Sequence, residues 1–209
     1  MSDWTRRRVL GRLSGATLLP ALLPLGPATA WASDAPVELE GFSFEPTVQL
    51  GGAKLLLNGA AVSSILSVRT NVVALYLPRR TTTPEAALAE PGPKRLCFYA
   101  MRDVSAKDLS NTFLERLRQN ATQEEIMANF VQISQFGGAF GNRPKLNRGD
   151  FVTLDFTPAA NGTVMALNGQ KMGDPMQGES FFRMMMKIWM GPKVKASTRT
   201  ALGGDGNKT

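Results

Sequence analysis

The chain has 209 residues, and its 24 Lys and Arg residues outnumber 17 Asp and Glu residues to give a formal net charge of +7. It contains no histidine, which excludes Ser-His-Asp hydrolysis, histidine-based zinc sites and haem bound through histidine. The lone cysteine, Cys97, excludes an intrachain disulfide, and its apolar surroundings predict a buried, unreactive thiol. Because no glycine-rich nucleotide loop, metal-binding carboxylate motif or basic stripe with aromatic residues occurs, we expect no cofactor, metal or nucleic-acid partner.

Residues 1–32 have the pattern of a cleavable export signal. Arginines at 6–8 form a basic head, an apolar stretch follows at 18–25, and small residues up to Ala32 suit a cleavage site within 30–33. The apolar stretch is too short to cross a bilayer, so we expect no membrane span once the signal is removed. The paired arginines favour the twin-arginine export route, and the general secretory route is the alternative. The alternative to an export signal as such is an amphipathic N-terminal arm. These features predict a periplasmic protein.

The rest of the chain is long enough for one domain, which we expect at residues 33–203, followed by a disordered tail at 204–209. Without the five charged residues of the signal, 20 Lys and Arg face 16 Asp and Glu, so the mature net charge is +4. Much of the basic character therefore belongs to the signal.

Strand patterns open the predicted domain. Alternating apolar residues and glycines predict a hairpin at Gly51-Gly52, and Asn58-Gly59 is typical of a second turn. A long strand is expected from Ile65 to Leu77, and a buried strand from Arg95 to Met101. A later hairpin is expected at Asn168-Gly169.

Helix-capping residues mark the predicted helices. Thr83 precedes Pro84 at a helix start, and Ser105 and Thr122 each begin a capping box. The predicted helices run over about 84–90, 105–119, 122–136, 178–190 and 196–202. The order of strands, helices, strands and helices predicts an α+β domain with an antiparallel sheet backed by helices.

Six segments of the chain carry a family resemblance: Phe44-Glu45-Pro46, Leu57 to Val62, Val73 to Leu77, Pro91 to Leu96, Arg102 to Ala106 and Phe181 to Gly191. In this order, they resemble the chalcone isomerase-like family, and most closely its exported bacterial branch. The resemblance covers residues 37–203 and implies an open-faced sandwich, in which a large antiparallel β-sheet has a layer of α-helices on one face and a ligand cleft between them.

The family's isomerases cyclise chalcones, and this resemblance implies where their site residues would lie. Ser63 stands where the family has arginine, Asn71 where it has threonine, and Val104 where it has tyrosine. Asn111 alone keeps the family's residue and is the catalytic candidate, while Phe182 replaces a serine or threonine. The charged group that stabilises the reacting phenolate is therefore missing from its usual position.

Two arginines could replace the missing charge. Arg69 would share one strand face with Ser63 and Asn71 if the strand has no bulge, and Arg102 precedes a helix. The alternatives are a solvent-facing or carboxylate-paired Arg69 at the sheet edge and a local ion pair between Arg102 and Asp103. The proposed ligand-binding set is Ser63, Arg69, Asn71, Arg102, Asn111 and Phe182.

Three functions remain open at this point. The first is non-catalytic binding of a small amphipathic ligand such as a fatty acid, because some members of this superfamily bind fatty acids. The second is isomerisation of a chalcone-like enone at a rearranged site, and the third is a structural role in the periplasm. The methionines at 184–186 suit core packing better than a copper site, because they fall on an apolar helix. A cavity with Arg69 or Arg102 at its mouth would favour binding, and one filled by Phe182 and methionines would favour the structural role.

Overall fold

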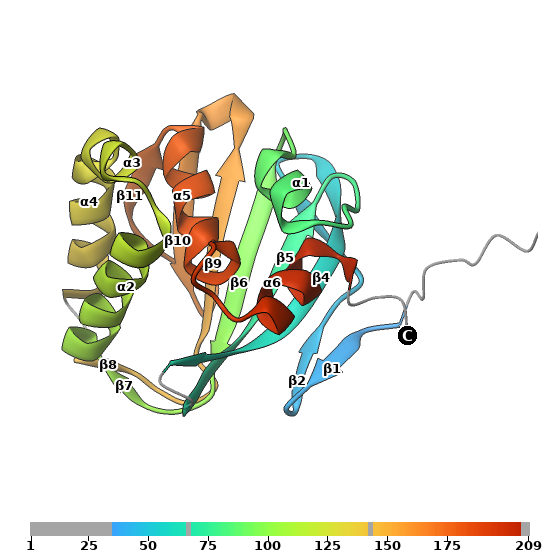
Figure 1. Ribbon diagram of the computed structural model, residues 1–209, viewed down its shortest axis with the longest axis horizontal. Coiled ribbons are helices and arrows are strands. Elements are labelled where there is room, and N and C mark those ends of the chain that lie inside the picture. The colour runs from blue at the N-terminus through green and yellow to red at the C-terminus, as the bar shows by residue number, and fades with distance from the viewer. Residues whose placement is uncertain (1–34, 66–67, 142–143, 206–209) are drawn as a thin grey trace, which may run out of the picture. The chain divides into compact units, whose positions relative to one another are not determined.

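The computed structural model describes residues 35–65, 68–141 and 144–205. The export signal predicted for residues 1–32 lies outside the described residues, as do the last four residues of the predicted tail, 206–209. The described part has the predicted α+β fold, a large antiparallel sheet with helices (Figure 1). None of its helices is long and apolar enough to cross a membrane.

The main sheet has seven strands in the order β11-β10-β9-β6-β5-β4-β3, and every neighbouring pair is antiparallel. The described chain leaves the sheet to form one helix between β5 and β6 and three helices between β6 and β9. The strands are β3 (Thr47–Leu50), β4 (Ala53–Ile65), β5 (Val68–Leu77), β6 (Lys94–Ala100), β9 (Phe151–Thr157), β10 (Gly162–Leu167) and β11 (Gln170–Gln177).

Helices and two small sheets complete the described chain. Helices α1, α5 and α6 lie in front of the main sheet in Figure 1, α2 packs beside α5, and α4 packs against α2 and β11. The helices are α1 (Pro84–Ala89), α2 (Ala106–Asn120), α3 (Gln123–Ala128), α4 (Phe130–Gly141), α5 (Glu179–Met190) and α6 (Ala196–Gly203), with a 3-10 turn η1 (Pro158–Ala160). The small sheets pair β1 (Val37–Leu39) with β2 (Phe42–Phe44), and β7 (Val104–Ser105) with β8 (Lys145–Leu146).

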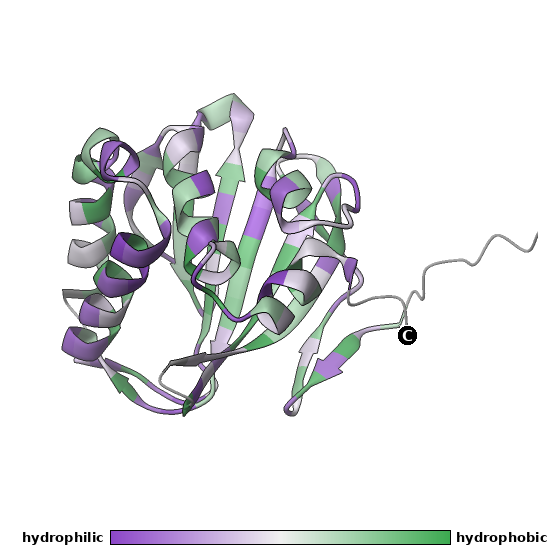
Figure 2. Cartoon of the chain, viewed as in Figure 1, coloured by the Kyte–Doolittle hydropathy of each residue, from purple (hydrophilic) through white to green (hydrophobic). Residues whose placement is uncertain are grey.

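Each face of the main sheet carries its own apolar cluster. On the helix face, Phe181, Phe182 and the methionines at 184–186 of α5 are fully buried against the central strands, as core packing requires. Figure 2 shows these central strands as a largely hydrophobic band. On the opposite face, the β1–β2 hairpin covers a smaller cluster that contains Phe44, Tyr76 and Cys97. Burial raises the pKa of the Cys97 thiol far above its usual value, which confirms the predicted inert cysteine.

Several local predictions are confirmed by backbone geometry. Gly51 and Gly52 turn between β3 and β4 with φ of +57° and +80°. Asn168 and Gly169 also have positive φ, as a tight hairpin turn requires. The hydroxyls of the predicted capping residues Thr83, Ser105 and Thr122 accept backbone N–H groups in the first turns of α1, α2 and α3. The full capping box forms only at Thr122 of the two predicted, because the Asp108 carboxylate accepts the Ser105 hydroxyl instead of the Ser105 N–H.

The turn predicted at Asn58-Gly59 is wrong, because both residues lie inside β4. A shift in strand register falls between Leu57 and Gly59, which marks a bulge rather than a reversal of the chain. The buried Asn58 side chain donates to the Leu202 carbonyl at 2.7 Å and accepts the Thr81 N–H at 2.7 Å. These distant partners hold Asn58 in the sheet.

Two predicted elements are divided in the structure. The strand predicted from Ile65 to Leu77 belongs to two antiparallel strands, because β4 ends at Ile65 and β5 begins at Val68. The helix predicted to end near residue 136 stops at Ala128, and α4 follows. Between them, the buried Asn129 donates its amide to the Glu125 carbonyl and accepts the Ser180 hydroxyl.

Candidate ligand-binding site

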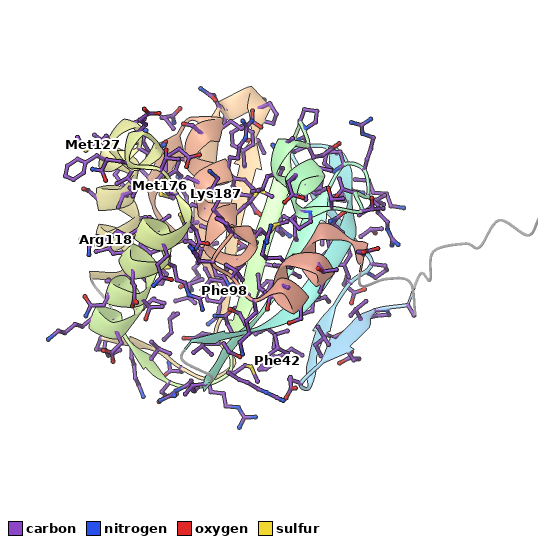
Figure 3. The ribbon with its side chains drawn as sticks, viewed as in Figure 1. Phe42, Phe98, Arg118, Met127, Met176 and Lys187 are labelled. Carbon is purple, nitrogen blue, oxygen red and sulfur yellow. The ribbon has the colours of Figure 1, made fainter. Side chains whose placement is uncertain are left out.

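A cavity of about 320 Å³ lies between the main sheet and helices α2, α4 and α5. Its volume falls at the lower end of the range for small-molecule sites. Phe98, labelled near the centre of Figure 3, lies on the sheet side of it. The lining residues are mainly apolar toward the interior, while charged side chains lie where α2 begins and along one side of α2.

Aromatic residues form most of the apolar wall. Phe113 of α2 stacks on Phe136 of α4 with ring centroids 4.4 Å apart, and Phe136 meets Phe140 edge-on at 5.5 Å. On the sheet side, Phe98 packs against Trp189 of α5 at 5.6 Å. Because these rings pack against one another, the apolar wall is already formed in the absence of a ligand. The cavity can therefore accept an apolar group without first reorganising.

Helix α2 supplies both a polar and an apolar stripe to the cavity. Asp108, Thr112 and Arg116 recur every four residues and so lie on one helix face. Leu109 and Phe113 form the neighbouring apolar stripe. The cavity thus changes from apolar to polar across the width of a single helix.

Arg116 is the least exposed of the charged residues that line the cavity. Its guanidinium is half-buried, and the resulting loss of water lowers its pKa from the usual value. It donates to the Ser64 carbonyl at 2.6 Å, and it forms no ion pair with a carboxylate of the described residues. Guanidinium has five N–H donors, so it can still donate two parallel hydrogen bonds to a carboxylate. A bound anion would also relieve the cost of burying this charge.

A chain of hydrogen bonds crosses the opposite wall. Trp189 Nε1 donates to Asn71 Oδ1 at 3.1 Å, Asn71 Nδ2 donates to Thr70 Oγ1 at 3.1 Å, and Thr70 Oγ1 donates to the Ser63 carbonyl at 3.3 Å. The chain joins α5 to the paired ends of β4 and β5. Asn71 is therefore already engaged in holding the wall.

Arg102 lies at the rim of the cavity and is exposed. The local ion pair considered for it does not form: Asp103 instead accepts Lys145 Nζ at 2.6 Å and the Arg148 N–H at 2.9 Å. These two hydrogen bonds lower the pKa of Asp103. Among the described residues, no carboxylate pairs with Arg102, so its charge stays available at the entrance.

The structure brings together three of the six residues in the predicted ligand-binding set. Ser63, Asn71 and Arg102 line the cavity, and Ser63 and Asn71 are cross-strand partners. Phe182, by contrast, is fully buried beside Phe156 in the core, and Asn111 is exposed on α2 while the next residue, Thr112, lines the cavity.

Arg69 does not line the cavity either. Its guanidinium binds Glu40 at 2.5 Å, and its side chain is 61% exposed, which is the edge ion pair considered as the alternative. The reason is the shift in register between Ser63 and Ser64, which pairs Arg69 with Ser64 but Asn71 with Ser63. The assumption of one unbroken strand face for Arg69 and Ser63 is therefore wrong.

The sequence prediction missed the aromatic wall of the cavity and, among its polar lining residues, Thr112 and Arg116. The spacing of these two residues from Asp108 could have placed them on one face of the predicted helix. Only the three-dimensional packing shows that this face meets the end of β4. Among the described residues, no group of three or more metal-binding side chains occurs.

Comparison with known proteins places this chain in a family. The chalcone isomerase-like family model matches residues 36–202, and the chain belongs to that family. A crystal structure of a fatty-acid binding protein from Arabidopsis thaliana is similar in fold, with a TM-score of 0.64 and 14% sequence identity over 83% of this chain and 98% of that one. No curated protein sequence matches this chain significantly.

Proposed function

We propose that this protein binds a single-chain amphipathic molecule with an anionic head group, such as a fatty acid, and does not transform it. The observation that carries the proposal is a cavity of about 320 Å³ whose aromatic wall adjoins Arg116. This arginine is half-buried and forms no ion pair with a carboxylate of the described residues. An apolar cavity with a positively charged side chain at one side can bind the tail and the anionic head group of an amphiphile. The Arabidopsis thaliana protein of similar fold is a fatty-acid binding protein, which supports the same class of ligand.

The structural alternative is disfavoured by what fills the core. A purely structural role predicted a cleft filled by Phe182 and the methionines at 184–186, yet these side chains are buried elsewhere and the cavity stays open. The open cavity has Arg102 at its rim, which is the arrangement expected of a binding protein.

The first test measures fatty-acid binding by calorimetry across a series of chain lengths. If each carbon of the tail occupies about the 30 Å³ of a water molecule, the cavity volume of about 320 Å³ holds roughly ten carbons. Each buried methylene contributes about 0.8 kcal/mol, so the Kd should fall roughly fourfold per carbon from hexanoate to decanoate. Beyond decanoate the Kd should level off, because the added carbons remain in water.

Matched alcohols provide the control for this series. Decanol has the same tail as decanoate but no charge for Arg116, so it should bind more weakly. Equal binding of the two would remove the proposed role of the anionic head group. No binding of any member of the series would remove the ligand-binding function itself.

Isomerisation of a chalcone-like enone is a second candidate function. The favouring observation is that the Arg116 guanidinium shares its part of the cavity with the hydroxyl-bearing Ser63 and Thr112. A guanidinium and hydroxyl donors can stabilise developing negative charge during ring closure. Against it, Val104 lines the cavity at the position where the family resemblance implies a tyrosine.

We further propose that the protein belongs to the exported bacterial branch of its family and works in the periplasm. The supporting pattern is the basic head at 6–8, the apolar stretch and the small residues before position 33. Changing Arg6→Lys together with Arg7→Lys should stop export, as measured by the amount of mature-sized protein in the periplasmic fraction. Arg12→Lys is the matched control and should leave export unchanged. Unchanged export in the double variant would instead indicate the general secretory route.

A further inference from the structure

A second cavity of about 320 Å³ lies against the C-terminal half of α2. It is bounded by the end of β4, by α2, by the turn between α5 and α6 and by α6. All but one of its lining residues are polar or charged: Ser63, Ser64, Thr112, Glu115, Arg116, Gln119, Lys193, Val194, Lys195 and Thr198.

The two cavities adjoin each other. Ser63, Thr112 and Arg116 line both of them, so the Arg116 guanidinium stands at their boundary. On one side of this boundary the walls are aromatic, and on the other they are hydroxyls, an amide and charges. A molecule that occupied both would need an apolar tail and a sizeable polar head group.

The lysines of the second cavity project from a fixed turn. Asn120 at the end of α2 accepts the Lys193 backbone N–H at 2.8 Å, and the Val194 N–H closes the turn on the Gly191 carbonyl at 3.1 Å. Gly191 packs so closely on Asn120 that a Cβ there would lie 2.4 Å from the Asn120 Cβ. The backbone that carries Lys193 and Lys195 is therefore held against α2.

The second cavity has more positive charge than is needed to neutralise the single charge of a bound fatty-acid carboxylate. Arg116, Lys193 and Lys195 face a single lining carboxylate, Glu115, which accepts the Gln119 amide at 3.0 Å. Neither lysine forms an ion pair with a carboxylate of the described chain. A phosphate monoester carries a charge of about −1.5 to −2 near pH 7 and three acceptor oxygens, so it matches this surplus.

We infer that the preferred ligand is an alkyl or acyl chain that ends in a phosphate monoester, with its tail in the aromatic cavity and its phosphate among Arg116, Lys193 and Lys195. This inference rests on the proposed binding function and names its substrate class. Arg116 contacts the phosphate at the boundary, and the two lysines contact it from the α5–α6 turn.

The test compares two probes that share a tail, dodecyl phosphate and dodecanoate, by calorimetry at low salt. The purified protein should bind dodecyl phosphate about tenfold more tightly, because two further cations contact the phosphate from a partly exposed position. The Lys193→Gln, Lys195→Gln double variant should lose this tenfold preference and bind the two probes with Kd values within about twofold of each other. Its melting temperature should match that of the unmodified protein, because both side chains are exposed.

The control variant is Lys54→Gln with Lys171→Gln, which removes the same charge from exposed lysines that line neither cavity. It should keep the full preference for dodecyl phosphate. Equal binding of the two probes, or a preference that survives in the Lys193, Lys195 variant, overturns the inference and leaves fatty-acid binding standing. Inorganic phosphate that binds as tightly as dodecyl phosphate would also overturn it, since the tail would then contribute nothing. Failure of both probes to bind would overturn the inference and the proposed function together.

Discussion

Replacing Gly59 by alanine should destabilise the protein by about 4 kcal/mol or more, the largest effect we expect of any single substitution here. An added Cβ would lie 1.8 Å from the Ala201 carbonyl oxygen and 3.2 Å from the Leu202 Cα. The obstacle is the backbone of α6, which cannot rotate away as a side chain can. Helix α6 would have to move off β4, and the hydrogen bond from Asn58 to the Leu202 carbonyl would break with it.

Thermal denaturation followed by circular dichroism measures this effect. A loss of about 4 kcal/mol in a domain of this size lowers the melting temperature by roughly 10 °C or more. Gly137→Ala is the matched control, since a Cβ at Gly137 of α4 meets nothing within 4 Å. That change should stabilise the protein by about 0.5–1 kcal/mol, because alanine favours a helix interior. A melting temperature for Gly59→Ala within 2 °C of the unmodified protein would contradict the close approach, as that is roughly the effect of less than 1 kcal/mol.

Gly59 also shows where local sequence patterns stop being informative. Asn168-Gly169 and Asn58-Gly59 are the same dipeptide, and local rules predict a turn for both. The first is a turn, and its Asn168 side chain bonds Asp150 and Phe151 at the start of β9 without leaving that turn. The second stays in a strand because the Asn58 amide finds Leu202 and Thr81 far along the chain. Those long-range partners cannot be read from a dipeptide.

The caps and most of the strands were predictable for the opposite reason, since each depends on residues that are close together in sequence. Thr122 and Glu125, for example, cap α3 reciprocally within four residues. The split at Asn129 was not predictable, because the hydroxyl that its side chain accepts belongs to Ser180 of α5. Tertiary hydrogen bonds therefore account for the differences at Asn58 and at Asn129.

The candidate site divides in the same way. Ser63 and Asn71 were found through the family resemblance, and the structure places them side by side in the cavity wall. Arg69 was chosen by counting residues along one strand, and a single bulge was enough to direct it to Glu40 instead. Arg116 was missed because its importance depends on α2 packing against the end of β4.

Arg116→Gln should weaken fatty-acid binding by about 2–3 kcal/mol, or roughly 30- to 150-fold in Kd. The guanidinium offers charged, parallel hydrogen bonds to a carboxylate, whereas glutamine offers one neutral amide. Arg116→Lys should give an intermediate loss, because it keeps the charge but not the paired donors. Calorimetry with decanoate measures all three proteins, and circular dichroism confirms that the variants are folded.

Arg69→Gln is the matched control for this experiment, because it removes an arginine of the same protein that is exposed and bound to Glu40. Its Kd for decanoate should change by less than about twofold, as an exposed ion pair outside the cavity contributes little. If Arg69→Gln weakened binding and Arg116→Gln did not, the head group would lie elsewhere.

The Arg116 variant also separates binding from catalysis. If the protein only binds its ligand, the absorbance of a chalcone solution should fall no faster with the protein than in buffer, whichever residue occupies position 116. A faster loss of absorbance that Arg116→Gln abolishes and Arg69→Gln preserves would instead establish the isomerase, because the guanidinium would then be stabilising the charge of ring closure. The binding function predicts the first result, since the position at which the family resemblance implies a tyrosine carries Val104, which has no group to donate. One cationic side chain thus discriminates between the two functions that this cavity could serve.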